Sequence, residues 1–528
     1  MSRFLLLFIM FFGGGKLCIN AQTVIKGTCG KDGSTVNWEF SFSQGLLLIT
    51  GEGEMQDFAL DQHPEWETLK DFIREISIEE GVTSIGTRAF ADFKDVKALE
   101  VPTSVESIGD SAFCNWNFLR SYKIGENIKW ISPTAFIGCY RLTRFVVEEG
   151  NGFFEIGSYG ELIDRKNKRL LIFPASSSPH LTTYEIPENV TEIGGCAFNF
   201  CNQLQSVGIH ANVTSVGEGA FASCSSLSSI KVSQENPFFV EENGILYNKG
   251  KSRLIVYPAA LDGNALEVPV TVTDIARFAF SSCSKLNTVV LPSSVRTIGR
   301  SAFAACDKLE YVTFLNGMER IEKNAFSGCE NLKSVSIPSS VGYIASDAFE
   351  GCSELNRIEV EGGNEAYSSS DDGMLFDKGK KILLFCAGNR NEVRLPVTLV
   401  GISSGAFADC TARKVYFPET LKSITLGALA FKRSKSKLDF YLPCAEPPRI
   451  SDEERLAYFI SNASTGKTFD MLFFANPLYR KFLNVIDSFR FKGDKDVVLH
   501  VPQGCKQKYV DRIVWRTLFG NKIKGDIK

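Results

Sequence analysis

The stretch LPSSVRTIGRSAFAACDKL, from Leu291 to Leu309, returns 46 residues later as IPSSVGYIASDAFEGCSEL, from Ile337 to Leu355. The two stretches carry a proline, the phrase Ser-Ser-Val, an Ala-Phe pair and a cysteine at the same offsets. A sequence that repeats at a fixed interval is typical of a solenoid, in which each repeat adds one coil to a stack. The Ala-Phe pair therefore serves to locate the coils along the chain.

The Ala-Phe pair recurs with a regular spacing. Six of the steps between successive pairs are 23 residues long, one is 24, and three longer steps are 62, 59 and 58 residues. Each long step exceeds one period by 35–39 residues, which indicates an inserted segment. The phenylalanines of the eleven pairs are Phe90, Phe113, Phe136, Phe198, Phe221, Phe280, Phe303, Phe326, Phe349, Phe407 and Phe431.

Within one coil, the residues predict a short strand followed by a turn. Val289 and Leu291 lie two residues apart, so both side chains point to one face of a strand, and Pro292 ends that strand because it has no N–H for the ladder. The segment SAFAAC is too short for an independent α-helix. One coil cannot bury its apolar face alone, whereas stacked coils can, with each phenylalanine packed on the next. The pattern predicts a mainly β solenoid with short helical or 3₁₀ turns.

The repeated phrase Leu-x-x-Val-x-Ile-Pro-x-Ser-Val-x-x-Ile-Gly-x-x-Ala-Phe-x-x-Cys resembles the BspA-type leucine-rich repeat of bacterial surface proteins. The resemblance extends from about Phe72 to Phe431, some two thirds of the chain. Residues 27–58 are similar to the β-rich N-terminal cap of that family, and residues 497–523 are similar to its closing cap. The resemblance implies a leucine-rich-repeat solenoid with a cap at each end, and adhesion to proteins of a host or a neighbouring cell.

The three inserted segments are related to one another. They begin NGFFEI, NPFFVE and NEAYSS. Each has a lysine-rich turn with one short apolar run before it and one after it. This pattern predicts a β-hairpin, which either extends a sheet of the solenoid or protrudes from it. The repeats that carry the hairpins span about residues 148–176, 233–260 and 361–388.

The two ends of the chain differ from the repeats. A basic start at Arg3, the apolar run of residues 4–12 and a small residue at Ala21 predict a signal peptide that is cleaved near Ala21-Gln22. An uncleaved N-terminal strand and a lipoprotein beginning at Cys18 are the alternatives. The predicted domains are a signal peptide (1–21), an N-terminal cap (22–71), repeats (72–447), an irregular or helical insertion (448–496) and a C-terminal cap (497–528).

Cysteine occupies one fixed position in most coils. Eight of the 15 cysteines lie three residues after the phenylalanine of an Ala-Phe pair, where Phe93 and Trp116 stand in other coils. The position therefore requires an apolar side chain, and we expect buried free thiols there. Scattered disulfides and a metal site remain alternatives. The eight residues are Cys139, Cys201, Cys224, Cys283, Cys306, Cys329, Cys352 and Cys410.

Two stretches resemble motifs of enzymes, but neither is good evidence for a catalytic site. GISSG at residues 401–405 fits a nucleophile elbow but occupies the ordinary Ile-Gly position of a repeat, and SNASTGKT at residues 461–468 lacks the first glycine of a phosphate-binding loop. The net charge of −3 gives no reason to expect a nucleic-acid partner. We expect no enzymatic activity, no cofactor and no metal site. The four histidines are His63, His180, His210 and His500.

A long array without catalytic chemistry suits a macromolecular partner. We expect an exported, non-enzymatic protein that is secreted or associated with the bacterial surface or outer membrane, without a transmembrane segment in the mature chain. Its expected partner is a protein of a host or neighbouring cell surface or matrix. A structural role in the envelope and glycan binding are the alternatives. The predicted binding residues point outward from the strands and are Glu100, Lys123, Glu185, Lys231, Glu267, Thr313, Ser336, Glu359, Arg394 and Tyr416.

Overall fold

The computed structural model of the chain describes residues 24–59, 64–93, 95–96, 98–386, 388, 390–403, 405–424, 438–450, 497–519 and 522–528. The predicted signal peptide, Ala430-Phe431 and residues 451–496 lie outside these ranges. The chain forms two compact units. The first contains the described residues up to Cys224 together with Val232–Phe238, and the second contains Ser225–Lys231 and the described residues from Phe239 onward.

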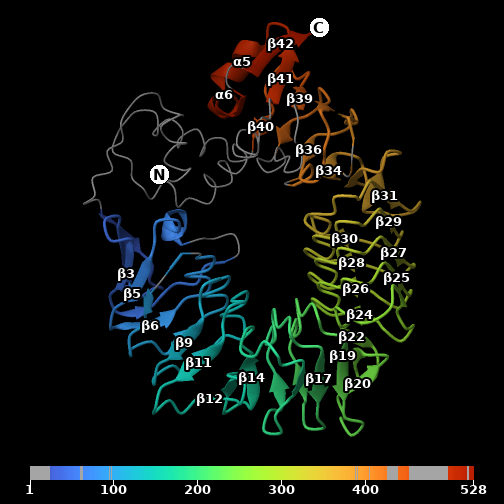
Figure 1. The fold of residues 1–528 in the computed structure, drawn as a ribbon. Coiled ribbons are helices and arrows are strands. Elements are labelled where there is room, and N and C mark those ends of the chain that lie inside the picture. Colours follow the sequence, from blue (N-terminus) through green and yellow to red (C-terminus); the bar gives the residue numbers. More distant parts are fainter. Residues whose placement is uncertain are drawn as a thin grey trace. The chain divides into compact units, whose positions relative to one another are not determined.

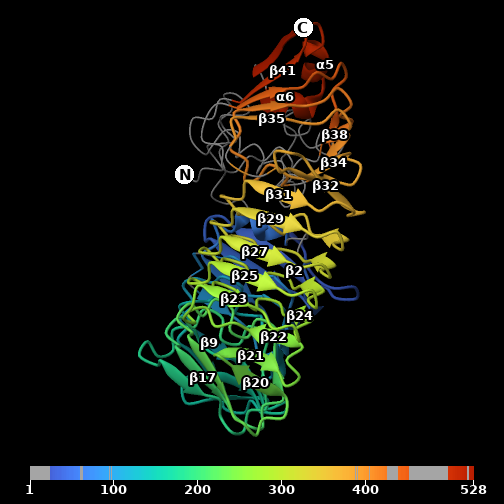
Figure 2. The ribbon, with the colours of Figure 1, turned by 90° about the vertical axis from the view of Figure 1, so that its right-hand side faces the viewer.

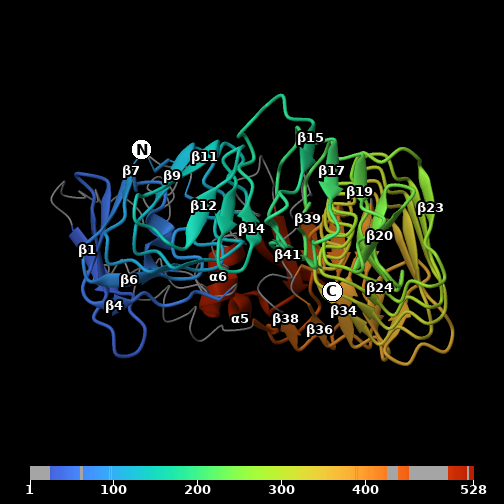
Figure 3. The ribbon, with the colours of Figure 1, turned by 90° about the horizontal axis from the view of Figure 1, so that it is seen from below.

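The first unit begins with an antiparallel meander of three strands, β1 to β3, and its coils then add parallel strands. Each coil contributes one strand to each of two columns, which we call the longer and the shorter strands after their usual lengths, although β6 of the shorter column has four residues. The longer strands β9 and β11 lie side by side in parallel (Figures 1 and 3). The longer strands are β1 (Val24–Thr28), β2 (Asn37–Ser41), β3 (Leu46–Thr50), β5 (Glu75–Ile78), β7 (Ala98–Glu100), β9 (Ser121–Ile124), β11 (Arg144–Val147), β15 (Thr183–Glu185) and β17 (Ser206–Ile209). The shorter strands are β4 (Gly53–Glu54), β6 (Val82–Ile85), β8 (Ser107–Ile108), β10 (Trp130–Ile131), β16 (Glu192–Ile193) and β18 (Ser215–Val216), and a 3₁₀ helix, η1, covers Glu65–Leu69.

The second unit repeats this arrangement. Its longer strands pair in parallel as β23-β25-β27-β29-β31, and Figure 2 shows them as successive rungs. The longer strands are β19 (Ser229–Val232, of which all but Val232 belongs to this unit), β23 (Ala265–Glu267), β25 (Thr288–Leu291), β27 (Tyr311–Phe314), β29 (Ser334–Ile337), β31 (Arg357–Val360), β35 (Glu392–Arg394), β37 (Lys414–Tyr416), β39 (Leu438–Tyr441), β41 (Val497–Pro502) and β42 (Ile523–Ile527). The shorter strands are β24 (Asp274–Ile275), β26 (Thr297–Ile298), β28 (Arg320–Ile321), β30 (Tyr343–Ile344), β36 (Gly401–Ile402), β38 (Ser423–Ile424) and β40 (Arg449–Ile450).

The phenylalanines of the Ala-Phe pairs form the core of the stack. The rings of Phe280 and Phe303 have their centroids 4.4 Å apart at an interplanar angle of 10°, and Phe303 lies 5.0 Å from Phe326 at 7°. The Phe303 N–H donates to the carbonyl of Ala325 in the next coil at 2.8 Å. Within the coil, the Cys329 N–H bonds back to the Phe326 carbonyl at 3.1 Å, as in a 3₁₀ turn. The predicted mainly β solenoid is confirmed for the part of the chain that the structure describes.

The hairpin segments extend the sheets of shorter strands. In the first unit, β12, β13 and β14 are antiparallel, and β14 then pairs in parallel with β16 of the next coil. In the second unit, β22 joins β24 and β34 joins β36 in the same way. Of the two arrangements that the sequence left open, extension of a sheet is therefore the one observed. The hairpin strands are β12 (Phe154–Ile156), β13 (Leu162–Asp164), β14 (Arg169–Ile172), β20 (Phe239–Glu242), β21 (Ile245–Asn248), β22 (Arg253–Val256), β32 (Tyr367–Ser369), β33 (Leu375–Asp377) and β34 (Ile382–Phe385).

The first asparagine of each hairpin segment is buried and fully hydrogen-bonded. The Asn364 amide nitrogen donates to the carbonyls of Pro338 and Val341 in the preceding coil, both at 2.9 Å. Its side-chain oxygen accepts from the N–H groups of Ala366 at 2.9 Å and Tyr367 at 2.7 Å. This side chain ties the third hairpin to the coil before it. The equivalent residues are Asn151 and Asn236.

The column cysteines are buried thiols, and all of them except Cys410 lie within hydrogen-bond reach of a main-chain carbonyl. The thiols of Cys306 and Cys329 lie 2.9 Å and 3.0 Å from the carbonyl oxygens of Phe280 and Phe303, respectively. Burial raises the pKa of Cys224 to about 12, so the thiol stays protonated and can donate. All 14 cysteines in the described ranges are free.

The C-terminal part of the second unit contains two short helices between its last two strands, β41 and β42. These are α5 (Lys506–Asp511) and α6 (Ile513–Phe519), which follow β41. The Tyr509 hydroxyl donates to the Cys444 carbonyl at 2.7 Å, and the Trp515 indole N–H donates to the Pro448 carbonyl at 3.2 Å. Both aromatic side chains are buried, so the helices cover the apolar edge of the last coils.

Candidate binding surface

The structure places all ten predicted binding residues on longer strands, with side chains pointing away from the core. The alternate residues of these strands, such as Val312, Val335 and Ile358, are buried in the core. Nine of the ten side chains are exposed and Tyr416 is half-buried. The exposed nine are Glu100, Lys123, Glu185, Lys231, Glu267, Thr313, Ser336, Glu359 and Arg394.

The three predicted residues of the first unit do not form a common site. Glu100 lies on β7, Lys123 on β9 and Glu185 on β15, and these strands belong to three different sheets. Lys123 forms an ion pair with Glu148. An exposed pair of this kind contributes about 0–1 kcal/mol and gives little basis for specific recognition.

The sheet β23-β31 brings several predicted residues of the second unit into register. Glu267 pairs with Val290, Val290 pairs with Thr313, and Ser336 pairs with Glu359. The resulting surface mixes acidic, hydroxyl and apolar side chains. It contains Tyr311, which is 46% exposed and lies under the Lys333 ammonium at 5.3 Å. No single chemical character dominates it.

The last sheet of the second unit, β35-β37-β39-β41-β42, carries a continuous stack. Arg394, Tyr416, Tyr441 and His500 face one another across successive strands, and we call these four residues the aromatic row. The Arg394 guanidinium lies 4.0 Å from the Tyr416 ring centroid. The Tyr416 and Tyr441 rings are 4.5 Å apart at 11°, and the Tyr441 and His500 rings are 4.5 Å apart at 9°. Figure 1 shows β39 and β41 next to each other in this sheet.

Carboxylates position the imidazole at the end of the aromatic row. The His500 Nδ1 atom lies 2.9 Å from both carboxylate oxygens of Asp526, and its Nε2 atom lies 3.4 Å from Asp439. Partial burial and the Asp439 charge raise the pKa of Tyr441, so its hydroxyl remains protonated at neutral pH. His500 is buried, Tyr416 and Tyr441 are half-buried and Arg394 is exposed, so the accessible part of the row consists of Arg394 and the two tyrosines.

Of the aromatic row, Arg394 and Tyr416 were predicted from the sequence, whereas Tyr441 and His500 were not. The missed residues follow the last Ala-Phe pair, where the phenylalanine spacing can no longer locate the coils. A second signal was present, because a strand ending in proline recurs at Leu442-Pro443 and Val501-Pro502. Counting back from these prolines places Tyr441 and His500 on the outward face.

Metal-binding and catalytic motifs have little structural support in the described part of the chain. It contains no group of three or more His, Cys, Asp and Glu side chains that could hold a metal ion. The predicted elbow motif begins on β36, and the Ser403 N–H bonds to the Leu383 carbonyl at 2.9 Å as part of the coil. The motif at residues 461–468 lies outside the described ranges. The helices that are described include none long and apolar enough to cross a membrane.

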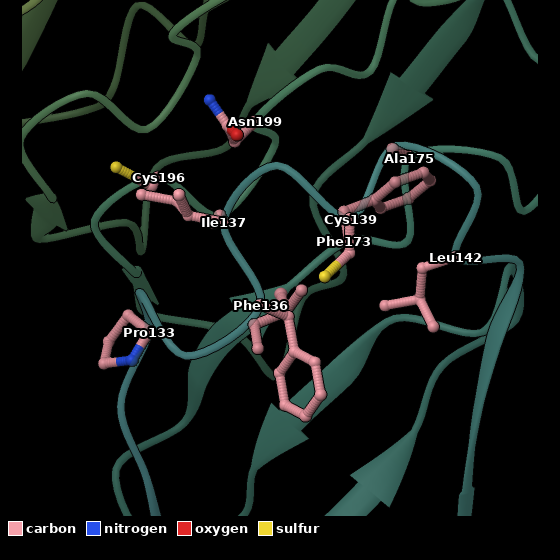
Figure 4. Close-up of a pocket in the computed structure, with 11 residues that line it drawn as sticks. Pro133, Phe136, Ile137, Cys139, Leu142, Phe173, Ala175, Cys196 and Asn199 are labelled. Carbon is pink, nitrogen blue, oxygen red and sulfur yellow. The ribbon is translucent and has the colours of Figure 1, made fainter. Parts of the chain in front are cut away.

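A small cavity lies in the first unit, next to the first hairpin repeat. Its volume is about 10 Å³, the space of one water molecule, and most of the side chains that line it are apolar (Figure 4). Phe136, Leu142 and Phe173 line it, with Asn199 at its edge. This cavity is a packing gap between coils and is too small for an organic ligand.

Comparison with known proteins identifies the repeat. The sequence profile described as "BspA type Leucine rich repeat region" matches six copies over residues 69–159, 175–245, 260–370 and 383–444, which is more than half of the chain. No curated protein matches.

Solved structures of leucine-rich repeat proteins are also similar. One from Eubacterium ventriosum is 24% identical, with 77% of this chain and 88% of that chain covered and a TM-score of 0.33. A leucine-rich cell surface protein from Faecalibacterium prausnitzii is 25% identical, with 64% and 95% covered and a TM-score of 0.31. The pneumococcal vaccine antigen PcpA is 16% identical, with 79% and 94% covered and a TM-score of 0.34. Because these TM-scores are below 0.5, the assignment rests on the repeat profile and the coil geometry. On these grounds the chain belongs to the BspA-type leucine-rich repeat family.

Proposed function

We propose that the chain is an exported, non-enzymatic adhesion protein that binds a protein partner through the aromatic row of its C-terminal sheet. The row is the observation that carries the proposal. Tyrosine and arginine are, with tryptophan, the residue types most enriched at the energetic centres of protein interfaces. The three accessible side chains, Arg394, Tyr416 and Tyr441, lie on neighbouring strands about 4.8 Å apart and span roughly 10 Å, and the buried His500 supports them from behind the last ring.

The surroundings of the row also suit a protein interface. Lys414 and Arg394 form ion pairs with Glu392 at 3.2 Å and 3.3 Å, so charged groups flank the rings. A rigid aromatic centre with a polar rim is the usual composition of a protein-binding patch. Because neighbouring rings occupy each other's faces, little ring face is left for a sugar to stack on. This arrangement favours a protein over a glycan.

Export is proposed from the N-terminal sequence. The basic start and apolar run of residues 1–21 have the pattern of a cleaved signal, which would leave a mature chain of residues 22–528. Adhesion to a host or neighbouring-cell protein follows from the resemblance of the repeats to those of bacterial surface proteins. The other predicted strand-face residues lie on other sheets and form no part of the proposed contact.

The proposal is tested by a binding screen of the mature chain against host matrix proteins and whole cells. We expect saturable binding to a protease-sensitive component, weakened at least about 30-fold in Tyr416→Ala/Tyr441→Ala, since an interface centre contributes about 2 kcal/mol or more.

Tyr343→Ala is the matched control for this screen. Tyr343 is an exposed tyrosine on β30, among the shorter strands, and it also stacks with an arginine, Arg320, at 4.3 Å. Full binding by the row variant, or equal losses in both variants, would exclude the aromatic row as the site. Binding that resists protease but is lost after glycan removal would show that the partner is a glycan.

A further inference from the structure

Two thiols meet in the core of the third hairpin repeat. The Sγ atoms of Cys386 and Cys410 are 3.6 Å apart, and both side chains are 0% exposed. Cys386 ends the hairpin that contains β34, and Cys410 belongs to the cysteine column of the next coil. Both residues lie in the second unit.

The equivalent positions of the other two hairpin repeats hold aromatic rings. Phe173 and Tyr257 each follow the last strand of a hairpin, and their N–H groups donate to Ala197 and Ala279 of the next coil, both at 2.7 Å. The Cys386 N–H donates in the same way to Ala406 at 2.8 Å. Cysteine therefore replaces the ring at this one of the three positions.

The replacement changes what the column cysteine contacts. After the first two hairpins, the thiols of Cys201 and Cys283 approach the carbonyls of Phe173 and Tyr257 at 3.8 Å and 3.9 Å. After the third, the Cys410 thiol instead contacts the thiol of Cys386. The two sulfurs need to approach by only about 1.5 Å to reach bonding distance.

We propose that Cys386 and Cys410 form a disulfide that cross-links the third hairpin repeat to the following coil. The proposal is independent of the binding partner, but it rests on the export of the chain, because exported proteins fold where disulfides persist. The bond would join two cysteines that are 24 positions apart in the sequence. It would anchor the start of the coils that carry the aromatic row.

The chemistry is a thiol–disulfide exchange with a disulfide oxidant of the glutathione type. One cysteine thiolate attacks the oxidant, forms a mixed disulfide and releases one oxidant thiol. The thiolate of the second cysteine then attacks the sulfur of the first, forms the Cys386–Cys410 bond and releases the second oxidant thiol. Two cysteine thiols are oxidised, and one oxidant disulfide is reduced to two thiols that take up both protons. Since both side chains are buried in the folded chain, the exchange occurs before the coil closes.

Peptide mapping tests the proposal directly. The reduced, denatured mature chain is refolded in a buffer of reduced and oxidised glutathione, alkylated in denaturant and cleaved with trypsin. We expect residues 382–390 and 395–413 to be recovered as one linked species that separates on reduction. Cys306 and Cys329, neighbours in the same column whose thiols face carbonyls, are the matched control and should be alkylated.

A Cys386→Phe variant and a measurement of thermal unfolding test whether the linked species is the specific Cys386–Cys410 bond. Cys386→Phe restores the ring found at Phe173 and Tyr257, and it should fold and lose the linked species. Reductant should lower the unfolding midpoint of the wild-type chain by several degrees and leave that of Cys386→Phe unchanged. Alkylation of Cys386 and Cys410 to the same extent as Cys306 and Cys329 overturns the proposal. Loss of partner binding by the aromatic-row variant has no bearing on it.

Discussion

The thiol of Cys329 lies 3.0 Å from the main-chain carbonyl oxygen of Phe303, the aromatic residue of the preceding coil. The same contact joins Cys352 to Phe326 at 3.1 Å and Cys224 to Phe198 at 3.0 Å. At these positions the cysteine is therefore more than an apolar filler, because its thiol gives a second donor to a carbonyl that the stack has removed from water.

Replacing the thiol should show whether its hydrogen bond matters. Both Cys329→Ala and Cys329→Ser remove the sulfur, but only serine keeps a side-chain donor for the Phe303 carbonyl. We expect the alanine variant to be less stable than the serine variant by about 1 kcal/mol, the usual net value of a hydrogen bond. The free energies of urea unfolding of the two variants provide the comparison. An alanine variant as stable as the serine variant would mean that the cysteine only fills apolar space and that its hydrogen bond does not matter.

The cysteine column also predicts a loss of stability in alkali. Burial raises the pKa of Cys224 from its ordinary value of 9.0 to about 12. Between these values the unfolded chain releases the thiol proton and the folded chain keeps it, so stability is complete below pH 9 and declines as the pH rises toward 12. The decline is at most about 1.4 kcal/mol per pH unit for this group.

Cys224→Ala isolates the contribution of one thiol from that of the lysines and tyrosines that titrate in the same range. The unfolding midpoints of the variant and the wild-type chain should converge as the pH is raised from 8 to 11 under reducing conditions. A difference between them that is constant with pH would mean that the Cys224 thiol is not protected in the folded chain.

The buried asparagines should be among the most sensitive polar positions. Asn364→Ala leaves the carbonyls of Pro338 and Val341 without the donor that each receives from the side chain. Each buried polar group that loses its partner costs about 1–3 kcal/mol, so we expect a loss of about 3 kcal/mol. The exposed Asn391 is the control, and Asn391→Ala should stay within about 0.5 kcal/mol of the wild type. Equal losses of unfolding free energy in Asn364→Ala and Asn391→Ala, measured by chemical denaturation, would contradict the role of Asn364 in joining its hairpin to the preceding coil.

The stacked rings predict a large packing effect. Phe303 is 0% exposed and lies between Phe280 and Phe326, so Phe303→Ala opens a cavity that neighbouring coils cannot fill. The expected cost is about 3–5 kcal/mol. Phe303→Leu keeps most of the apolar volume and should cost clearly less. Hydrogen exchange would locate the effect, with the coils around Phe303 losing protection first if the stack carries the stability.

Arg394 provides an independent test of the binding proposal. Its guanidinium stacks on the outermost ring of the aromatic row, so Arg394→Ala should weaken partner binding about tenfold, and Arg394→Lys should retain part of the affinity. Surface plasmon resonance with the captured partner measures both. Additive losses in Arg394→Ala/Tyr416→Ala would show that the two side chains act separately instead of as one stack.

The repeats made most of the fold predictable from the sequence. The spacing of Phe280, Phe303 and Phe326 fixed one ring per coil, and the strand period around Val289 fixed which residues face outward. The hydrogen bonds of Asn364 and of the cysteine column were not predictable in this way, because they join residues of successive coils and depend on the stacking register. The aromatic row was only partly predicted, since Tyr441 and His500 follow the last Ala-Phe pair and are joined to Tyr416 by strand pairing alone.

The contacts between coils recur with a constant sequence offset, since the thiol-to-carbonyl bonds of Cys306, Cys329 and Cys352 each span 26 residues. Duplication or deletion of one 23-residue unit in the gene would therefore recreate every such bond at the new junction. Coil number is consequently the property that can vary most freely during evolution, and relatives can differ greatly in length while each end retains its own capping and recognition residues.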